Sequence, residues 1–301
     1  MKKMILLFAL LLSAGLSAYA QDQIDDETNF WFEVIDNGTA VEITGYKGSA
    51  ADVRFPERIQ GLPVTRIADW AFYDRGLTGT VIIPDSVTHI GADAFGHNEL
   101  TGVSIGNSVM HIGDSAFMGN QLTNVIIPDS VVDIRQLAFS SNRLVSISIG
   151  NSVARIDQGA FQDNLLTSVT IPSSLTDIDS GVFQNNRITN VSIPDSVTRI
   201  DFRAFENNRL SSVSIPNEIT RISGGTFAKN QLASVTIPNG VTHIDREAFR
   251  GNRLTNISIP DSVTHIGARA FRDNQLTSVS VPSGAFIAPN AFDPSVTVTR
   301  R

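Results

Sequence analysis

Four of the five histidines fall into two pairs with the same spacing, and each pair could supply two ligands to a metal ion. His89 and His111 are 22 residues apart, and so are His243 and His265. Imidazole is a common zinc ligand, but a stable zinc site needs more than two protein ligands. Because the same position elsewhere in the chain holds Asp or Arg, we interpret it as an exposed position that tolerates exchange. The sequence therefore predicts no metal site, and a two-histidine surface site is the alternative.

A serine motif also suggests catalysis at first sight. Residues 102–106 read Gly-Val-Ser-Ile-Gly, which fits the nucleophile elbow of serine hydrolases. That elbow needs a strand that turns sharply into a helix, with Asp and His downstream. Neighbouring stretches read V-S-I-P at these positions, so Gly106 only replaces a repeated proline. We predict that the protein is not an enzyme and has no cofactor.

Two further sets of residues recur at regular spacing along the chain and are the remaining candidates for chemistry. We call the arginines the arginine column, and the serines and threonines the hydroxyl column. Regularly spaced arginines on a rigid face would bind an acidic or sulfated partner, and a flat hydroxyl-bearing face would dock one. For both columns, a merely solvated surface is the alternative. The residues predicted to form a partner-binding surface are Arg143, Arg187, Arg209, Arg253, Ser192, Ser214, Thr236 and Ser258. The hydroxyl column continues through Ser104, Ser148, Thr170 and Ser280.

Composition narrows the function classes further. The chain has 301 residues, of which 42% are hydrophobic, so it can bury a large core. It has no cysteine, which excludes disulfides, thiolate zinc sites, iron–sulfur clusters and a lipid-anchored N-terminal cysteine. Its net charge of −7 argues against a nucleic-acid-binding surface.

The N-terminus has the pattern of an export signal. Lys2 and Lys3 precede an apolar run from Met4 to about Leu12, and small residues end at Ala18-Tyr19-Ala20. This arrangement is typical of a secretory signal peptide cleaved after Ala20. The apolar run is too short to span a bilayer, and no later segment holds 18 consecutive apolar residues. We predict an exported chain with no membrane span, which is secreted or at the cell surface, with the periplasm as an alternative.

A single period organises the rest of the chain. Phe72 and Phe95 are 23 residues apart, steps of 22 then lead to Phe271, and Phe292 follows after 21. Three residues after the phenylalanine, an asparagine recurs without a break. These asparagines, which we expect to form a structural ladder, are Asn98, Asn120, Asn142, Asn164, Asn186, Asn208, Asn230, Asn252 and Asn274. An inward amide at each turn would satisfy backbone groups of neighbouring coils.

The repeating unit predicts a mainly β solenoid of about 22 residues per coil. Such a unit cannot close a core alone, but stacked coils bury a continuous one. The V-x-I segment predicts a short strand ended by proline, and V-T-x-I predicts a second one. Strands of successive coils should pair in parallel. We expect the stretch around Ala-Phe to form a short helical or 3₁₀ turn.

The two ends depart from the repeat. Alternating apolar residues around Asp36-Asn37-Gly38 predict a β-hairpin. The predicted domains are a signal peptide (1–20), an N-terminal hairpin cap (21–50), a solenoid (51–293) and a C-terminal cap (294–301).

The columns I-P-x-x-V-x-x-I-G-x-x-A-F resemble the BspA-like, or Treponema-type, class of bacterial leucine-rich repeats. Residues 83–95 and 259–271 carry this pattern, and the resemblance covers about residues 52–293. One departure is that many members have Cys where this chain has Asn98 and its equivalents. The resemblance implies a secreted or surface protein, because family members are typically of this kind. Several members take part in adhesion, and the family has no shared catalytic residues.

These observations lead to one function and one alternative. We predict an exported, non-enzymatic protein that binds a protein or glycan partner, as in adhesion to host matrix or cells. The alternative is a structural scaffold of the periplasm or cell envelope without a host ligand. The oligomeric state stays open.

Overall fold

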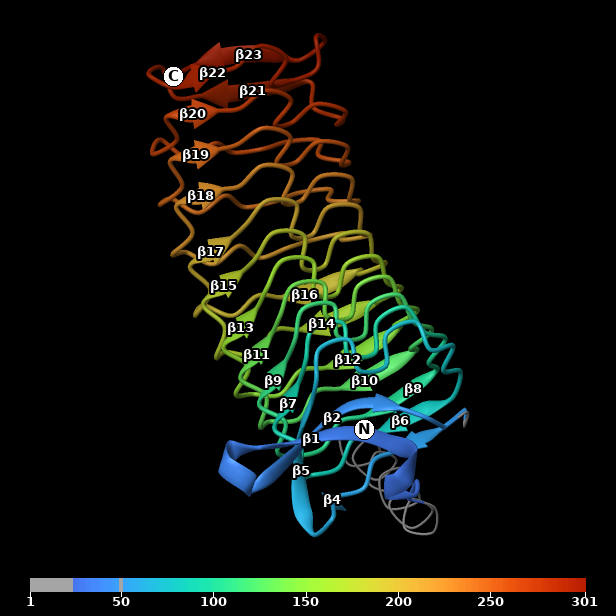
Figure 1. The fold of residues 1–301 in the computed structure, drawn as a ribbon. Helices are drawn as coiled ribbons and strands as arrows, with labels where there is room; N and C mark the ends of the chain where they lie inside the picture. The colour runs from blue at the N-terminus through green and yellow to red at the C-terminus, as the bar shows by residue number, and fades with distance from the viewer. Residues whose placement is uncertain (1–23, 49–50) are drawn as a thin grey trace, which may run out of the picture.

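The computed structural model describes residues 24–48 and 51–301. The predicted signal peptide therefore lies outside the described residues. Successive coils stack along one axis from the N-terminal hairpin to the C-terminus, and the stack twists as it rises (Figure 1). This is the predicted solenoid, and it is confirmed as a mainly β repeat structure with parallel strands. No helix among the described residues has the length and apolarity needed to cross a bilayer.

An antiparallel hairpin covers the first coil. Strands β1 (Phe30–Ile35) and β2 (Ala40–Tyr46) pair across a turn at Asp36–Gly38, where Asn37 has a φ of 57°. A short 3₁₀ helix, Glu27–Asn29, precedes β1. Strand β2 also pairs in parallel with β5 (Leu62–Ile67), so the hairpin supplies one more layer to the sheet of the coils.

The first coil contains an extra tight hairpin. Strand β3 (Val53–Arg54) opens the coil, and β4 (Arg58–Ile59) folds back on β5 in antiparallel register. Gln60 and Gly61 turn the chain with positive φ angles of 50° and 82°. The insertion before Val64 therefore forms a local turn and leaves the repeat register unchanged.

The V-T-x-I segments form one side of every coil. Each contributes a two-residue strand that ends in an isoleucine, which is buried in all of them except the last. Successive strands pair in parallel, with breaks before the strands that begin at Asp177 and Arg221. These strands are β7 (His89–Ile90), β9 (His111–Ile112), β11 (Asp133–Ile134), β13 (Arg155–Ile156), β15 (Asp177–Ile178), β17 (Arg199–Ile200), β18 (Arg221–Ile222), β19 (His243–Ile244), β20 (His265–Ile266) and β22 (Phe286–Ile287).

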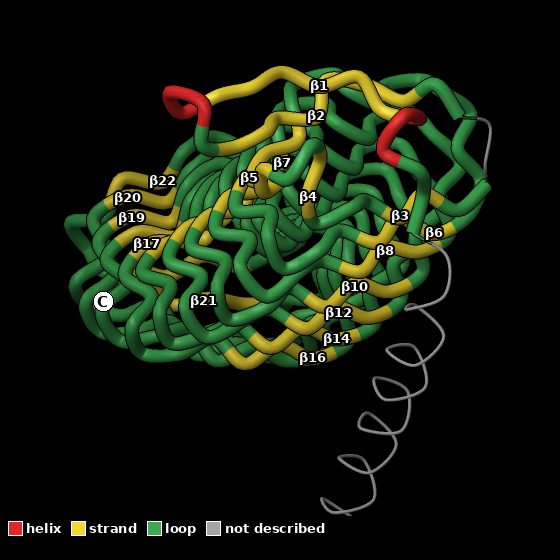
Figure 2. The backbone as a smooth tube through the Cα atoms, turned by 60° about the horizontal axis from the view of Figure 1, so that its bottom comes forward, coloured by secondary structure: helices red, strands yellow, loops and turns green. Residues whose placement is uncertain are grey.

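The V-x-I segments form a second side, seen as a separate row of strands in Figure 2. Their strands are β6 (Thr80–Ile82), β8 (Gly102–Ser104), β10 (Asn124–Ile126), β12 (Ser146–Ser148), β14 (Ser168–Thr170), β16 (Asn190–Ser192) and β21 (Ser278–Val281). Parallel pairing is present in pieces, β3-β6-β8, β10-β12 and β14-β16. The predicted strands at 213–215, 235–237 and 257–259 are not formed, so this part of the prediction is wrong.

Ring spacing in the core does not account for these interruptions. A fully bonded sheet needs strands 4.7–4.9 Å apart. The stacked phenylalanine rings of successive coils lie 5.0–6.0 Å apart from Phe72 to Phe292. Strands β14 and β16 nevertheless pair where the rings are 6.0 Å apart, whereas β8 and β10 do not pair where the rings are 5.2 Å apart.

The Ala-Phe stretches are tight turns, which corrects the prediction of helical turns there. Each stretch places a residue in the left-handed region two positions before the phenylalanine, for example Asp93 (φ 51°) and Gly159 (φ 66°). The turns bond to the next coil, since the Phe95 amide donates to the Ala116 carbonyl at 2.8 Å. In these turns, backbone hydrogen bonds between coils thus take the place of the hydrogen bonds that a helix would form within one coil.

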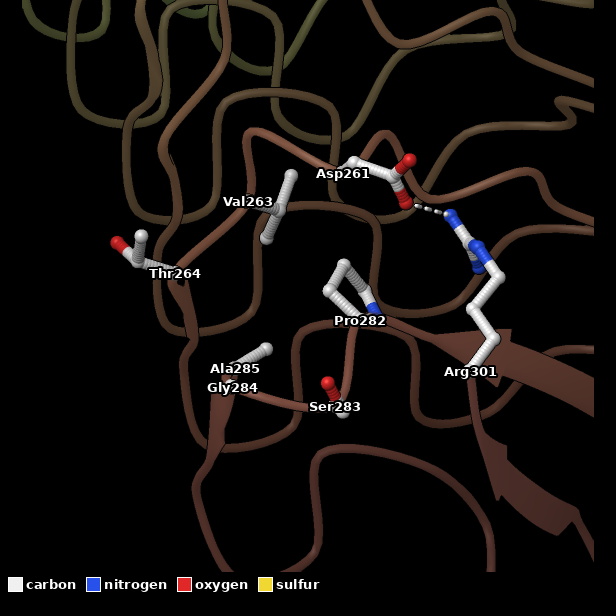
Figure 3. A pocket seen from close by; sticks show the side chains of 8 residues that line it. All are labelled: Asp261, Val263, Thr264, Pro282, Ser283, Gly284, Ala285 and Arg301. Carbon is white, nitrogen blue, oxygen red and sulfur yellow. Dashed lines mark hydrogen bonds and ion pairs between the residues drawn. The ribbon is translucent and has the colours of Figure 1, made fainter.

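The C-terminal end is closed by its own arginines. Strand β23 (Thr297–Arg300) pairs with β21, and Arg300 donates to the carbonyls of Ser283 and Ala285 at 2.7 and 3.0 Å. Arg301 forms an ion pair of 2.9 Å with Asp261 across a surface pocket (Figure 3). The limits of the predicted domains remain predictions.

Candidate interaction surface

All eight residues predicted to bind a partner are exposed. Each of the four arginines directly follows a ladder asparagine in the sequence. Each of the four hydroxyl residues lies five residues after the corresponding position in its coil. Each arginine is held by its backbone, since the Arg187 amide donates to the Leu166 carbonyl and the Arg209 amide to the Ile188 carbonyl, both at 2.9 Å. The solenoid therefore presents these side chains from fixed positions.

From Asn120 onward, the region between the ladder asparagine and the following proline or its equivalent forms a distinct surface, which we call the arginine face. The equivalent segment after Asn98 contains the exposed Glu99 and is not counted in this face. Its segments are residues 121–127, 143–149, 165–171, 187–193, 209–215, 231–237, 253–259 and 275–281. These segments contain four arginines, no lysine and no acidic residue. In a chain with 30 acidic residues, the arginine face is thus a positive surface on an acidic molecule.

The arginines of this face have no ion pair, unlike those of the V-T-x-I side and of the Ala-Phe flank. Within the described residues, the guanidinium groups of Arg143, Arg187, Arg209 and Arg253 contact no carboxylate. Ser192, Ser214, Thr236 and Ser258 likewise have hydroxyls without a partner in the described part of the chain. Both sets of groups are free to bind a ligand.

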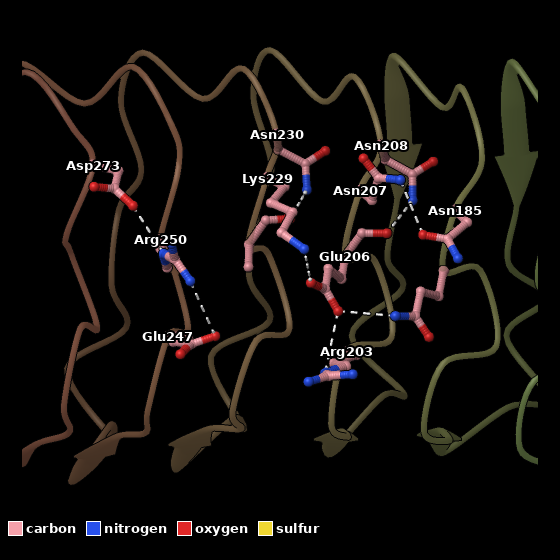
Figure 4. Close-up of polar contacts among 12 residues, drawn as sticks. Asn185, Arg203, Glu206, Asn207, Asn208, Lys229, Asn230, Glu247, Arg250 and Asp273 are labelled. Carbon is pink, nitrogen blue, oxygen red and sulfur yellow. Dashed lines mark hydrogen bonds and ion pairs between the residues drawn. The ribbon is translucent and has the colours of Figure 1, made fainter.

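The flank beside the Ala-Phe turns shows the opposite arrangement (Figure 4). Glu206 is only 6% exposed and accepts from Arg203 at 3.2 Å and from Lys229 at 2.9 Å. Arg250 bridges Glu247 and Asp273 at 3.8 and 2.9 Å. Because each cation there is neutralised by a carboxylate, this flank offers little positive field to a partner.

The asparagine ladder lies beneath the edge of the arginine face. Asn208, for example, donates to the Phe183 and Phe205 carbonyls at 2.8 and 3.2 Å and accepts from the Ile188 amide at 3.0 Å. Equivalent bonds recur at each ladder position, and all of these asparagines except Asn274 are buried. Their amides are fully engaged with the backbone, which leaves no capacity for a ligand.

The two histidine pairs stack on the V-T-x-I side. The ring centroids of His89 and His111 lie 4.6 Å apart, and those of His243 and His265 lie 4.5 Å apart. No group of three or more His, Cys, Asp or Glu suited to a metal occurs among residues 24–48 and 51–301. Each histidine pair could therefore supply two ligands to a metal ion, from its two stacked rings.

Asp133 corrects the expectation that the histidine position is exposed throughout. It is 4% exposed and accepts hydrogen bonds from His111 and from Arg155, the latter at 2.7 Å, while Arg135 lies 3.0 Å away. Burial opposes ionisation of this carboxyl, but the His111 and Arg155 hydrogen bonds hold its pKa below the ordinary value. Asp133 thus links its own coil to the preceding coil through His111 and to the following coil through Arg155.

The serine of the Gly-Val-Ser-Ile-Gly motif lies at the end of strand β8. The segment after Ser104 continues into a turn, with no helix at that point. The nucleophile elbow is therefore not formed, and Gly106 packs against the backbone of Pro84 in the preceding coil.

An exposed aromatic cluster near the N-terminal hairpin was not predicted from the sequence. Trp70 is 58% exposed and its ring lies 4.8 Å from that of Tyr73, which lies 5.3 Å from His97. Trp31 of β1 is 48% exposed, with the Arg75 guanidinium 5.8 Å from its ring. The only signal for this cluster was the placement of both tryptophans outside the repeat columns.

Comparison with known proteins places these features in a family. The model of the BspA type leucine rich repeat region matches residues 65–189 and 176–299. Curated proteins give no match. Among solved structures, a leucine rich cell surface protein from Faecalibacterium prausnitzii is 24% identical, with a TM-score of 0.56 over 91% of this chain and 87% of that one.

Two further structures share the fold. The pneumococcal vaccine antigen PcpA is 19% identical, with a TM-score of 0.61 over 93% of this chain and 88% of that one. A leucine-rich repeat protein from Bacteroides ovatus is 20% identical, with a TM-score of 0.57 over 93% and 90%. At these identities the likeness extends to the fold alone.

Proposed function

The chain belongs to the BspA-type leucine-rich repeat family, and from that premise we propose that it is an exported, non-enzymatic binding protein. Its partner is a protein or glycan, and the arginine face is the contact surface. The observation that carries this proposal is the absence of acidic residues from that face, together with its four unpaired arginines. Fold alone does not specify function, so the argument rests on this surface.

Three features support adhesion as the biological role. The N-terminal residues have the pattern of an export signal, and two solved structures of similar fold belong to a cell surface protein and a vaccine antigen. A rigid, elongated stack also presents many equivalent side chains to a large ligand. Adhesion to host matrix or cells follows as the proposed role.

A pair of variants tests the proposed contact surface. Ser214→Asp with Ser258→Asp places two negative charges on the arginine face, and Thr198→Asp with Thr220→Asp places two on the V-T-x-I side. We expect only the first pair to reduce binding of the purified protein to epithelial cells and to surfaces coated with fibronectin or collagen. If wild-type protein binds none of these surfaces, or if both pairs bind equally well, the proposal is wrong.

The alternative is a scaffold of the cell envelope without a host ligand. The salt-bridged flank in Figure 4 favours it, because cross-linked coils give a stiff rod. Protease treatment of intact cells separates the two functions. Cleavage of the protein on intact cells supports adhesion, whereas protection until the outer layer is broken supports the scaffold.

A further inference from the structure

We propose that the partner of the arginine face is a linear anionic polysaccharide, bearing sulfate or carboxylate groups, that lies along the solenoid axis. This inference rests on the proposed function, because it names the ligand of the same surface. It follows from the spacing of the arginines, from the chemistry of the groups between them, and from the charge of the rest of the chain.

The arginines form a row parallel to the stack. Arg187 and Arg209 lie in adjacent coils, so their backbones are about 5 Å apart. Arg143 and Arg253 each lie two coils farther out, about 10 Å beyond this central pair. A ligand that contacts all four must carry repeated negative groups along a line of some 25 Å. A linear polyanion has this property.

The guanidinium group is suited to these ligands. It presents a planar set of N–H donors that bind a sulfate or carboxylate through two parallel hydrogen bonds. An arginine that already holds a carboxylate, such as Arg199 beside Asp177 at 2.9 Å, has part of this capacity occupied. The four arginines of the face retain all of it.

The surface between the arginines favours a sugar over a folded protein. Protein interfaces depend on a few buried anchors, most often Trp, Tyr or Arg. The arginine face has no aromatic side chain, and its large exposed hydrophobic residues are Ile126 and Val145, near one end. Its other exposed groups include the hydroxyls of Ser192, Ser214 and Thr236, which suit the hydroxyls of a polysaccharide.

The remaining surface restricts where a polyanion can bind. Apart from these four arginines, the protein has 19 basic and 30 acidic residues. The rest of its surface therefore has a negative net charge and repels a polyanion. Acidic residues also border the arginine face, with Asp129 and Asp195 beyond the turn and Asp163 before the asparagine. This repulsion confines the ligand to one track, since unfavourable contacts add to specificity.

Heparin, a soluble sulfated polysaccharide, is the probe for the test. Arg187→Gln with Arg209→Gln removes two charges from the face, and Arg221→Gln with Arg246→Gln removes two from a V-T-x-I strand and from the turn after the next one. We expect the wild-type protein to bind heparin in calorimetry at low salt, with affinity falling as salt rises. The face pair should weaken binding about tenfold or more, and the control pair less than about threefold.

Each result has a defined meaning. No heparin binding by the wild type, or equal losses in the two pairs, overturns the polysaccharide proposal. If a matrix protein binds the face while heparin does not, the ligand class is wrong and the proposed contact surface stands. If the Ser214→Asp and Ser258→Asp pair leaves every form of binding unchanged, both proposals fail. Duplex DNA that binds as tightly as heparin would show a response to charge alone and would also overturn the proposal.

Discussion

At the scale of single residues, stability comes from side chains that join one coil to the next. Each ladder asparagine satisfies backbone groups of two coils, and each phenylalanine stacks on its neighbours in the core. Asn230 shows the pattern, since it donates to the Phe205 and Phe227 carbonyls at 2.9 and 3.2 Å and accepts from the Leu210 amide at 3.0 Å. Loss of such a residue leaves partners in both coils unsatisfied.

We expect Asn230→Ala to lower the free energy of unfolding by about 3 kcal/mol or more, because several buried backbone groups lose their partners. The adjacent Gln231→Ala is the control, since Gln231 is half-buried and its side chain makes no hydrogen bond within the described residues. Its effect should stay within about 0.5 kcal/mol. Urea unfolding followed by circular dichroism measures both, and equal losses would contradict the structural role of the ladder.

The phenylalanine column gives a second comparison. Phe161 is fully buried, with its ring 5.5 and 6.0 Å from the rings before and after it. Phe161→Ala should cost about 3–5 kcal/mol through the cavity it leaves. Phe202 is 47% exposed, so Phe202→Ala should lower the free energy of unfolding by less than about 1 kcal/mol. Thermal unfolding tests this, and a similar loss for both would show that the stacked rings are not the core.

The histidine pair near the N-terminus predicts a pH dependence. Burial, together with the charges of His111 and Arg66, lowers the pKa of His89 from its ordinary 6.5, against the opposing effect of Asp133 and Asp36. The unfolded chain therefore binds this proton more readily, so the contribution of His89 to stability is fully present above about pH 6.5 and is lost as the pH falls below it. His89→Gln should show a smaller loss in Tm between about pH 8 and pH 5. An unchanged loss would contradict this assignment.

At the scale of elements, the two strand types differ in how well the sequence predicts them. The V-T-x-I strands occur as predicted, because a buried isoleucine ends each of those from Ile90 to Ile266. The predicted helical turns are wrong because the turns depend on left-handed residues as varied as Asp93, Leu137 and Arg203. Glycine at three equivalent positions, Gly159, Gly181 and Gly225, was the available signal for a positive φ.

Other features were beyond sequence reasoning for a physical reason. The burial of Asp133 depends on charges supplied by His111 and Arg155 in neighbouring coils, and a single repeat does not reveal that compensation. The aromatic cluster likewise joins Trp31 of the hairpin to residues of the coils. The exposure of the arginine column, in contrast, follows from its position next to a buried asparagine.

The repeat itself predicts that whole coils can be removed. Deletion of residues 209–230 removes 22 residues and joins Asn208 to Gln231, so the asparagine register is kept. We expect this variant to fold with lower stability, because each coil contacts only its neighbours. Deletion of residues 209–219 breaks the register and should abolish cooperative unfolding. Circular dichroism and thermal melts distinguish the two, and equal behaviour would contradict the solenoid account.

At the scale of the whole molecule, charge is distributed by face. Acidic residues and paired cations lie on the flanks, and the unpaired arginines lie on the surface that lacks acids. The stack therefore has one side that attracts a negative partner and others that repel it. The central claim is that this side is the contact surface.

Hydroxyl-radical footprinting with and without heparin tests that claim most directly, because exposed reporter side chains occur on and off the arginine face. Ile126 and Val145 lie on it, with exposed fractions of 71% and 46%, whereas Phe202 and Trp70 lie off it at 47% and 58%. We predict that the ligand protects Ile126 and Val145 from oxidation and leaves Phe202 and Trp70 unchanged. Protection of Trp70 or Phe202, with no protection of Ile126 and Val145, would contradict the account.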